Sequence, residues 1–357
     1  MAFPDESGWI QGRILASVIC WLLGVGCLLS WNSIVTIHDY YQYLFPDYHS
    51  ARVLPIVYEP VVLTITAILT YYEATLNTRK RIILGFLLVF MSNAAIIALD
   101  LATSGGGGLG RLIGLCSIVI IVAVAQGSLE GALFGDLSMM CPEFMQNFLS
   151  GMAASGILTS CLRLITKAAF ETSRSGLRKG AMVLLSIATS FMMLCAVLYA
   201  FVFGKLPIVK YHRSKAASEG SKTVAADLRL TTKQLLIQNL DLAMAILLLH
   251  VLTLSIFPGF LSEDTEKHSL GSWSLLGATM SRFLLIPCIY FTAKYGSQGW
   301  MIFLTSFLGL SNGYLTLRVF TMAPQSYKGP EQNALGNLFA LFLLIGVGCT
   351  WLIGKGW

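Results

Sequence analysis

Charged residues are scarce in this sequence. Asp, Glu, Lys and Arg make up 12% of its 357 residues, whereas soluble domains carry about 25%. Hydrophobic residues fill 55% of the chain. This composition excludes the ordinary water-soluble classes and indicates a protein whose surroundings are the hydrocarbon of a bilayer.

Several chemical signatures are also missing. There is no P-loop, which argues against an ATP-driven pump, and no set of Cys and His residues has the spacing of zinc ligands. We therefore expect neither a metal nor a cofactor. No Asn-x-Ser/Thr sequon marks an outer side. The net charge of +6 arises from basic loops, which indicates membrane topology and no nucleic-acid partner.

Long apolar stretches are what the sequence has in abundance. About 20 mostly apolar residues in a helix cross a bilayer. Continuous stretches of that kind do not alternate as barrel strands do. The predicted fold class is an all-α polytopic membrane protein, a helical bundle with about ten spans. These run at 14–37, 53–73, 82–100, 112–135, 146–169, 180–204, 235–258, 274–293, 298–322 and 334–353.

Basic segments orient these spans. Arg79-Lys80-Arg81 follows the second span, and the loop at 205–233 is rich in Lys and Arg. Alternating spans place both on one side, which the positive-inside rule assigns to the cytoplasm together with the N-terminus. The turn after the fifth span conflicts with this scheme, because it carries Lys167 and Arg178 yet falls outside.

The basic loop also divides the chain. We expect an N-terminal six-helix bundle at 1–204, a basic cytoplasmic linker at 205–233 and a C-terminal helical bundle at 234–357. The Ser, Ala, Gly and Lys content of the linker favours a mobile segment.

The fourth and fifth spans combine glycines with polar side chains. Glycines recur every four residues in the fourth span and share one helix face, which allows a neighbouring helix to approach closely. Gln126 and Glu130 lie near that face. A carboxylate inside a bilayer is costly, so Glu130 should have a basic or amide partner, or a proton. The predicted helix-packing glycines are Gly127, Gly131, Gly135, Gly151 and Gly156.

Other spans hold isolated polar groups beside Gly or Pro. For Asn32, which follows Trp31, helix–helix hydrogen bonding is the simpler interpretation, and His250 is more often a packing residue than a proton relay. Residues 309–313 match G-x-S-x-G, but Ser311 lies in a membrane helix and not at a strand-to-helix turn, so an enzyme is not expected. Interruptions of this kind line the cavity between the halves of transporters.

Several short motifs together resemble one family. They are Trp31-Asn32-Ser33, His38-Asp39-Tyr40-Tyr41, the glycine-rich fourth span running to Pro142, Phe257-Pro258, Arg282–Pro287 and Ser311–Leu315. Their order over almost the whole chain resembles the equilibrative nucleoside transporters. The stretches 135–148 and 329–337 look most like the plant branch, the equilibrative nucleotide transporters. The resemblance implies a fold akin to the major-facilitator transporters and the movement of nucleosides such as adenosine and uridine, down their gradient or with protons.

The resemblance also implies a substrate site. The family has a glutamine on the fourth helix that reads the base, and the matching neighbourhood here offers Glu130 or Gly131, with Gln126 one turn earlier. A carboxylate there would accept from an exocyclic amine or titrate with a proton. The other implied residues are Leu28, Trp31, Asn32, Val35, Phe257, Pro258 and Asn312.

The C-terminal half departs from the family. Family members have eleven helices, and the eighth carries an Asp-x-x-Gly-Arg pattern that this sequence lacks. Ten spans would place both termini on one side and invert the last three helices. A re-entrant insertion at 259–281 would restore the order. We expect nucleoside transport by alternating access in the plasma membrane, surrounded by membrane lipids. The alternative is a non-transporting or regulatory isoform without the eighth helix.

Overall fold

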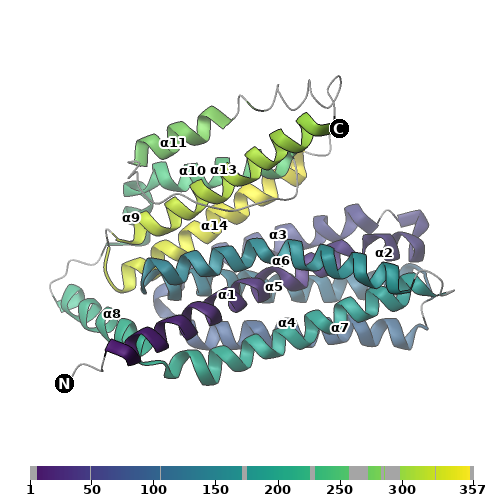
Figure 1. Ribbon diagram of the computed structural model, residues 1–357, viewed down its shortest axis with the longest axis horizontal. Coiled ribbons are helices and arrows are strands. Elements are labelled where there is room, and N and C mark those ends of the chain that lie inside the picture. The colour runs from purple at the N-terminus through teal and green to yellow at the C-terminus, as the bar shows by residue number, and fades with distance from the viewer. Residues whose placement is uncertain are drawn as a thin grey trace.

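The computed structural model describes residues 6–48, 50–104, 106–170, 175–225, 230–256, 272–282, 285, 298–325 and 327–353. Regular structure in these ranges is entirely helical, and most helices lie along the long axis of the molecule (Figure 1). The all-α class predicted from the sequence is thereby confirmed.

The first six predicted spans each correspond to one long helix. Residues 198–205, which belong to the sixth predicted span, form a π-helical and a 3-10 turn, η3 (Leu198–Val202) and η4 (Phe203–Lys205). Short helices α2 (His38–Leu44), η1 (Pro46–Tyr48) and η2 (Glu73–Thr75) connect the first three long ones. The long helices are α1 (Glu6–Thr36), α3 (Ser50–Tyr71), α4 (Thr78–Ala102), α5 (Leu109–Ser138), α6 (Pro142–Ala169) and α7 (Gly176–Val197).

Local sequence sets the boundaries of these helices. The Asn77 side chain accepts a hydrogen bond from the Lys80 backbone at 3.0 Å and caps α4. Gly108 precedes α5 with φ +131°, a conformation that glycine adopts without steric cost. The sequence predicts that Pro142 ends the fourth helix. In the structure α5 ends at Ser138, and Pro142 opens α6, where its missing N–H costs nothing.

The second half begins with the predicted basic linker, most of which is helical. Helix α8 occupies 207–225, and a capping box at Thr231 starts the short helix α9. Helices α9 and α10 are bent by 76° where they meet, so the predicted span at 235–258 is broken near its start. The helices of this part are α8 (Pro207–Ala225), α9 (Thr232–Gln238), α10 (Leu240–Ile256), α11 (Ser272–Ser281), α13 (Gln298–Gln325) and α14 (Pro330–Ile353).

Length and hydropathy mark the six long helices of the first half as candidate membrane spans. Six helices in the described part of the chain are long and apolar enough to cross a bilayer, or seven if the bent pair is one span. Large apolar side chains such as Ile14, Leu84 and Leu164 are more than 60% exposed. Such a surface is unfavourable in water and suits contact with lipid tails.

Close helix packing holds the N-terminal half together. A Cβ added at Gly151 on α6 would lie 2.1 Å from the Trp21 carbonyl oxygen on α1, and one at Gly24 would lie 2.0 Å from the Phe148 carbonyl oxygen. The two backbones therefore approach as closely as in small-residue membrane packing. By contrast, a Cβ at Gly156 would meet nothing within 4 Å, so a packing role for this glycine has no support from the structure.

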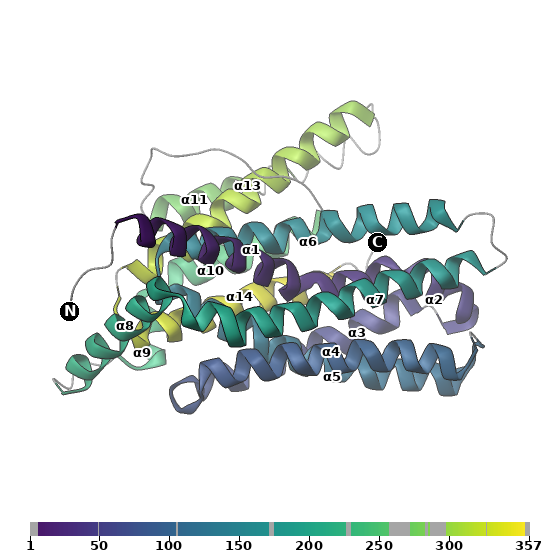
Figure 2. The same cartoon turned by 60° about the horizontal axis from the view of Figure 1, so that its bottom comes forward.

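The helix directions define two ends of the molecule. We call the end that holds α8, η2 and the beginning of α1 the α8 end, and the opposite one the far end (Figures 1 and 2). Helix α14 starts at the α8 end, where Asn333 contacts Glu73. It then runs alongside α10, with a Cβ at Gly346 placed 2.7 Å from the His250 Cβ. It finishes towards the far end, opposite to where α1 begins (Figure 1). The described part of α14 therefore ends at the opposite end of the molecule from the start of α1.

Candidate functional site

The α1 residues predicted to contact substrate lie on one face of the helix. Leu28 and Trp31 are partly buried and Val35 is 39% exposed. The Trp31 indole stacks on the Tyr58 ring of α3, with ring centroids 3.7 Å apart and an interplanar angle of 9°. One face of the indole is thus covered by Tyr58, which is 4% exposed, and the stack joins α1 to α3.

Asn32 makes a contact within the N-terminal half. Its amide nitrogen donates to the Ser155 hydroxyl of α6 at 3.0 Å. This bond agrees with the simpler interpretation of Asn32 as a helix-joining residue. Direct contact with a substrate stays a prediction.

The polar residues of α5 are deeply buried. Gln126 is 1% exposed and Glu130 is 2% exposed. The Gln126 amide nitrogen donates to the Cys27 carbonyl of α1. No cation or hydrogen-bond donor among the described residues pairs with Glu130, so the basic or amide partner expected for it is not found there. Its charged neighbour is another carboxylate, Glu59 of α3, which is itself buried.

The glycine face of α5 contacts two other helices. Near the middle, a Cβ at Gly127 would lie 2.8 Å from the Thr66 hydroxyl oxygen of α3. Farther along, a Cβ at Gly131 would lie 2.9 Å from the Asn337 side-chain oxygen, and one at Gly135 would lie 2.1 Å from that of Asn333. The predicted seam therefore joins α5 to α3 on one side and to α14 of the other half on the other.

Polar contacts across this junction lie at the α8 end. The Asn333 amide donates to the Glu73 carboxylate, and Arg81 donates to the Asn337 side-chain oxygen at 3.4 Å. The Ser138 hydroxyl donates to the Gln332 carbonyl at 2.8 Å. The Thr70 hydroxyl also donates to the Asn337 carbonyl in this region, at 3.4 Å. From there α13 diverges from the N-terminal helices towards the far end (Figures 1 and 2).

Sequence reasoning did not identify the junction residues of α14. Asn333 and Asn337 are 6% and 1% exposed and lie four residues apart in an otherwise apolar stretch. Two amides at this spacing share a helix face, which was the available signal for a polar contact with another helix.

In the second half, Asn312 contacts an arginine. Arg282 is 4% exposed and donates to the Asn312 side-chain oxygen at 3.3 Å and to the Leu308 carbonyl at 2.9 Å. This pair puts a buried cation next to a predicted site residue, although the Asp-x-x-Gly-Arg pattern is missing. Phe257 and Pro258, also predicted to contact substrate, lie outside the described residues.

Ser311 and His250, a hydroxyl and an imidazole that a hydrolase would pair, each bond to a carbonyl of their own helix. The Ser311 hydroxyl donates to the Leu308 carbonyl at 3.0 Å, and Nδ1 of His250 lies 2.9 Å from the Ile246 carbonyl oxygen. A nucleophile and its base must face each other within hydrogen-bond distance. This arrangement therefore gives no support to a serine hydrolase.

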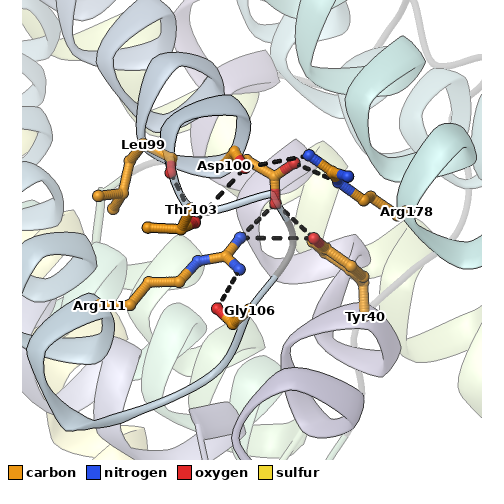
Figure 3. Close-up of polar contacts among 7 residues, drawn as sticks. All are labelled: Tyr40, Leu99, Asp100, Thr103, Gly106, Arg111 and Arg178. Carbon is orange, nitrogen blue, oxygen red and sulfur yellow. Dashed lines mark hydrogen bonds and ion pairs between the residues drawn. The ribbon is translucent and has the colours of Figure 1, made fainter.

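A charge network at the far end explains the basic turn that conflicts with the topology scheme (Figure 3). Asp100, which is 2% exposed, binds Arg111 of α5, Arg178 of α7 and the Tyr40 hydroxyl of α2. The Arg178 nitrogen lies 2.7 Å from the Asp100 carboxylate.

A second carboxylate at the far end, that of Asp39, also pairs with basic side chains. Asp39 pairs with Arg163 at 2.6 Å and with Lys167 at 3.6 Å. Basic residues here form ion pairs within the protein, so they are poor markers of the cytoplasmic side.

This helical bundle has the fold of the major-facilitator transporters. The solved proton:xylose symporter XylE superimposes with a TM-score of 0.66 at 8% identity, over 96% of this chain and 89% of that one. The fucose transporter FucP in its outward conformation gives a TM-score of 0.53 at 13% identity, over 98% of this chain and 92% of that one. At such low identity these likenesses show the fold.

Sequence comparison identifies the family. Residues 115–286 match the model of the family described as "Nucleoside transporter". The chain is 51% identical to equilibrative nucleotide transporter 3 of Arabidopsis thaliana, over 99% of this chain and 97% of the relative. It is 48% identical to equilibrative nucleotide transporter 4 of the same plant, over 97% and 96%. The chain belongs to the nucleoside transporter family, and it is a membrane transporter and not an enzyme.

The alignment with transporter 3 also includes gaps in this chain. It extends over 408 positions for the first relative, more than the 357 residues of this chain. The relative therefore has residues without counterpart here.

Proposed function

We propose that this chain carries nucleosides, adenosine and uridine among them, across the plasma membrane by alternating access. The observation that supports this most is the junction at the α8 end, where glycines and amides of the two halves meet, in a chain that belongs to the nucleoside transporter family. A carrier needs two halves that separate at one end while they meet at the other.

The chemistry of the predicted site favours a neutral solute. Trp31 offers flat apolar contact for a base, and the amide of Asn312 matches the hydroxyls of a sugar. Glu130 and its neighbour Glu59 supply no positive charge that would pair with a phosphate group. We therefore propose nucleosides as substrates in preference to nucleotides.

The α8 end is proposed to face the cytoplasm. Arg79, Lys80 and Lys210 are exposed there, as the positive-inside rule requires. The basic residues at the far end that argue otherwise are used in ion pairs with Asp100 and Asp39. The N-terminus then lies in the cytoplasm, and the conformation is closed on that side.

Uptake by the purified chain tests the proposal. We expect proteoliposomes that contain it to take up labelled adenosine and uridine saturably. Excess unlabelled nucleoside should compete, whereas AMP and UMP at the same concentration should not. Protein-free liposomes are the control for leakage. Absence of saturable uptake would favour the non-transporting isoform, and competition by AMP would overturn the preference for neutral substrates.

A further inference from the structure

A buried amide on α5 lacks a hydrogen-bond donor. The Gln126 nitrogen is used by the Cys27 carbonyl, which leaves Oε1 of Gln126 facing the protein interior as an acceptor. This oxygen is buried and has no partner among the described residues. An unsatisfied buried acceptor costs about 1–3 kcal/mol, so a donor is expected beside it.

Glu130 is the side chain placed to supply that donor. It follows Gln126 by four residues on the same helix, a spacing at which side chains are neighbours. An ionised carboxylate only accepts hydrogen bonds, whereas a protonated carboxyl has one O–H to donate. A single proton on Glu130 would satisfy the lone acceptor and remove a buried charge.

No cation among the described residues pairs with Glu130. It is 2% exposed, and the charged or titratable groups that interact with it are Glu59 and Tyr58 of α3 and Cys27 of α1. None of these is a cation. The arginine beside this stretch of α5 is Arg81 of α4.

Arg81 is already engaged elsewhere. It donates to the Ser128 carbonyl at 3.3 Å and to Asn337, and the charge that acts on it is that of Glu73. In a low dielectric, a second carboxylate nearby opposes ionisation of the first. Glu59 is such a group, and it lies in a part of α3 that is interrupted by Pro55 and Pro60.

We infer that Glu130 is a proton-binding site, occupied in this conformation, and that Glu59 is the neighbouring residue that controls its occupancy. The inference rests on the proposed function in one respect, namely that transport then depends on this proton. Close contact at Gly127 seals α3 against α5 next to the site. Separation of these helices would admit water and allow Glu130 to ionise.

Infrared spectroscopy of the purified chain tests proton occupancy without reference to transport. The carbonyl band of a protonated carboxylic acid should be present at about pH 7, without substrate, and should be missing in E130Q. The matched control is E143Q, because Glu143 is partly exposed and paired with Arg13. It should leave the band unchanged. A band that is absent from the wild type, or that persists in E130Q, would overturn the proton site.

A second variant keeps the test informative if E130Q fails to fold. In E59Q the neighbouring negative charge is removed, so the band should be lost at lower pH than in the wild type. An unchanged titration in E59Q would exclude control by Glu59.

Uptake measurements then connect the proton to transport. Wild-type uptake should fall as pH rises beyond the titration of the band, by at most about tenfold per pH unit for one proton. E130Q should show about equal uptake throughout that range. Wild-type uptake that does not vary with pH would refute the transport link while the proposed function stands. A titrating band without any uptake would refute the proposed function and leave the proton site intact.

Discussion

Trp31 of α1 stacks face to face on Tyr58 of α3, with ring centroids 3.7 Å apart. The stack lies next to Glu59 along α3 and joins the first and third helices of the N-terminal half. Such aromatic pairs contribute about 0.5–1.5 kcal/mol beyond their buried area. The indole that the sequence marks for substrate contact is therefore held in position by a second ring.

Removal of this stack should impair transport. We expect Trp31→Ala together with Asn32→Ala to lower nucleoside kcat/KM by about tenfold, since a loss of about 1.4 kcal/mol corresponds to that factor. Uptake in proteoliposomes at matched protein density is the measurement. Phe201→Ala is the control, because Phe201 is 62% exposed and outside the proposed site. Unchanged uptake in the double variant would count against the α1 site.

Closure at the α8 end should depend on the small size of Gly135. A larger side chain there would overlap Asn333 and Asn337 of α14. We expect Gly135→Val to lengthen the distance between spin labels placed at the exposed positions Ala74 and Lys328, and to reduce uptake.

The matched control for this prediction lies on the same helix. A Cβ at Gly110 would have nothing within 4 Å, so Gly110→Val should leave the label distance unchanged. Equal distances in both variants and the wild type would show that α14 does not depend on Gly135 for its position.

The charge network around Asp100 should be essential for stability. Asp100→Asn leaves Arg111, whose side chain is 7% exposed, without its anionic partner. Removal of one partner of a buried ion pair costs about 3–5 kcal/mol. We expect a clear decrease in the Tm of the detergent-solubilised protein.

Glu143→Gln supplies the comparison for Asp100. The Arg13–Glu143 pair is 59% and 36% exposed, and exposed pairs contribute about 0–1 kcal/mol. Its Tm should stay close to that of the wild type. A similar Tm for both variants would show that the network at the far end adds little stability.

Two glycines of α6 should differ in their tolerance of a methyl group. Gly151→Ala places a Cβ against the Trp21 carbonyl, which should destabilise the protein by about 1–3 kcal/mol through overpacking. Gly156→Ala meets open space and should be neutral. Thermal unfolding of the two variants under the same detergent conditions is the measurement, and the reverse order would contradict the α1–α6 contact.

The end of α14 should lie on the opposite side of the membrane from the start of α1. Its course from Asn333 past His250 requires this. A protease-accessible tag added after Trp357 should be cleaved from outside intact cells, while a tag before Met1 should be protected. Cleavage of both tags only after permeabilisation would restore the ten-crossing scheme.

The sequence predicted the helices well because membrane span length is a local property. Each described long helix contains most of a predicted span, and the glycine spacing around Gly131 marked the seam of α5. Two further features depend on contacts between distant segments. Helix α8 lies within the predicted linker, where Ile208, Val209 and Ala216 are buried. The direction of α14 follows from its packing beside α10 and not from charge bias.

The candidate site was less accessible to sequence reasoning. Residue types suggested Trp31, Gln126 and Glu130 as members of the substrate site, but the residues that contact them lie on other helices. Tyr58, Glu59 and Cys27 are distant from α5 in sequence, and nothing in their own neighbourhoods marks them as its neighbours. The junction of Asn333 with Glu73 joins residues separated by most of the chain.

The sequence by itself determined the medium and the secondary structure, because runs of apolar residues partition into lipid and must satisfy their backbone groups as helices. Only the tertiary structure decided which polar groups meet. Burial of the Asp100 carboxylate is unfavourable by itself, and it is offset by ion pairs with Arg111 and Arg178 from two other helices. Glu130 receives no such cation from the described helices. The free-energy penalty of burying a charged side chain follows from its own chemistry. The ion pairs that offset this penalty depend on how separate helices pack.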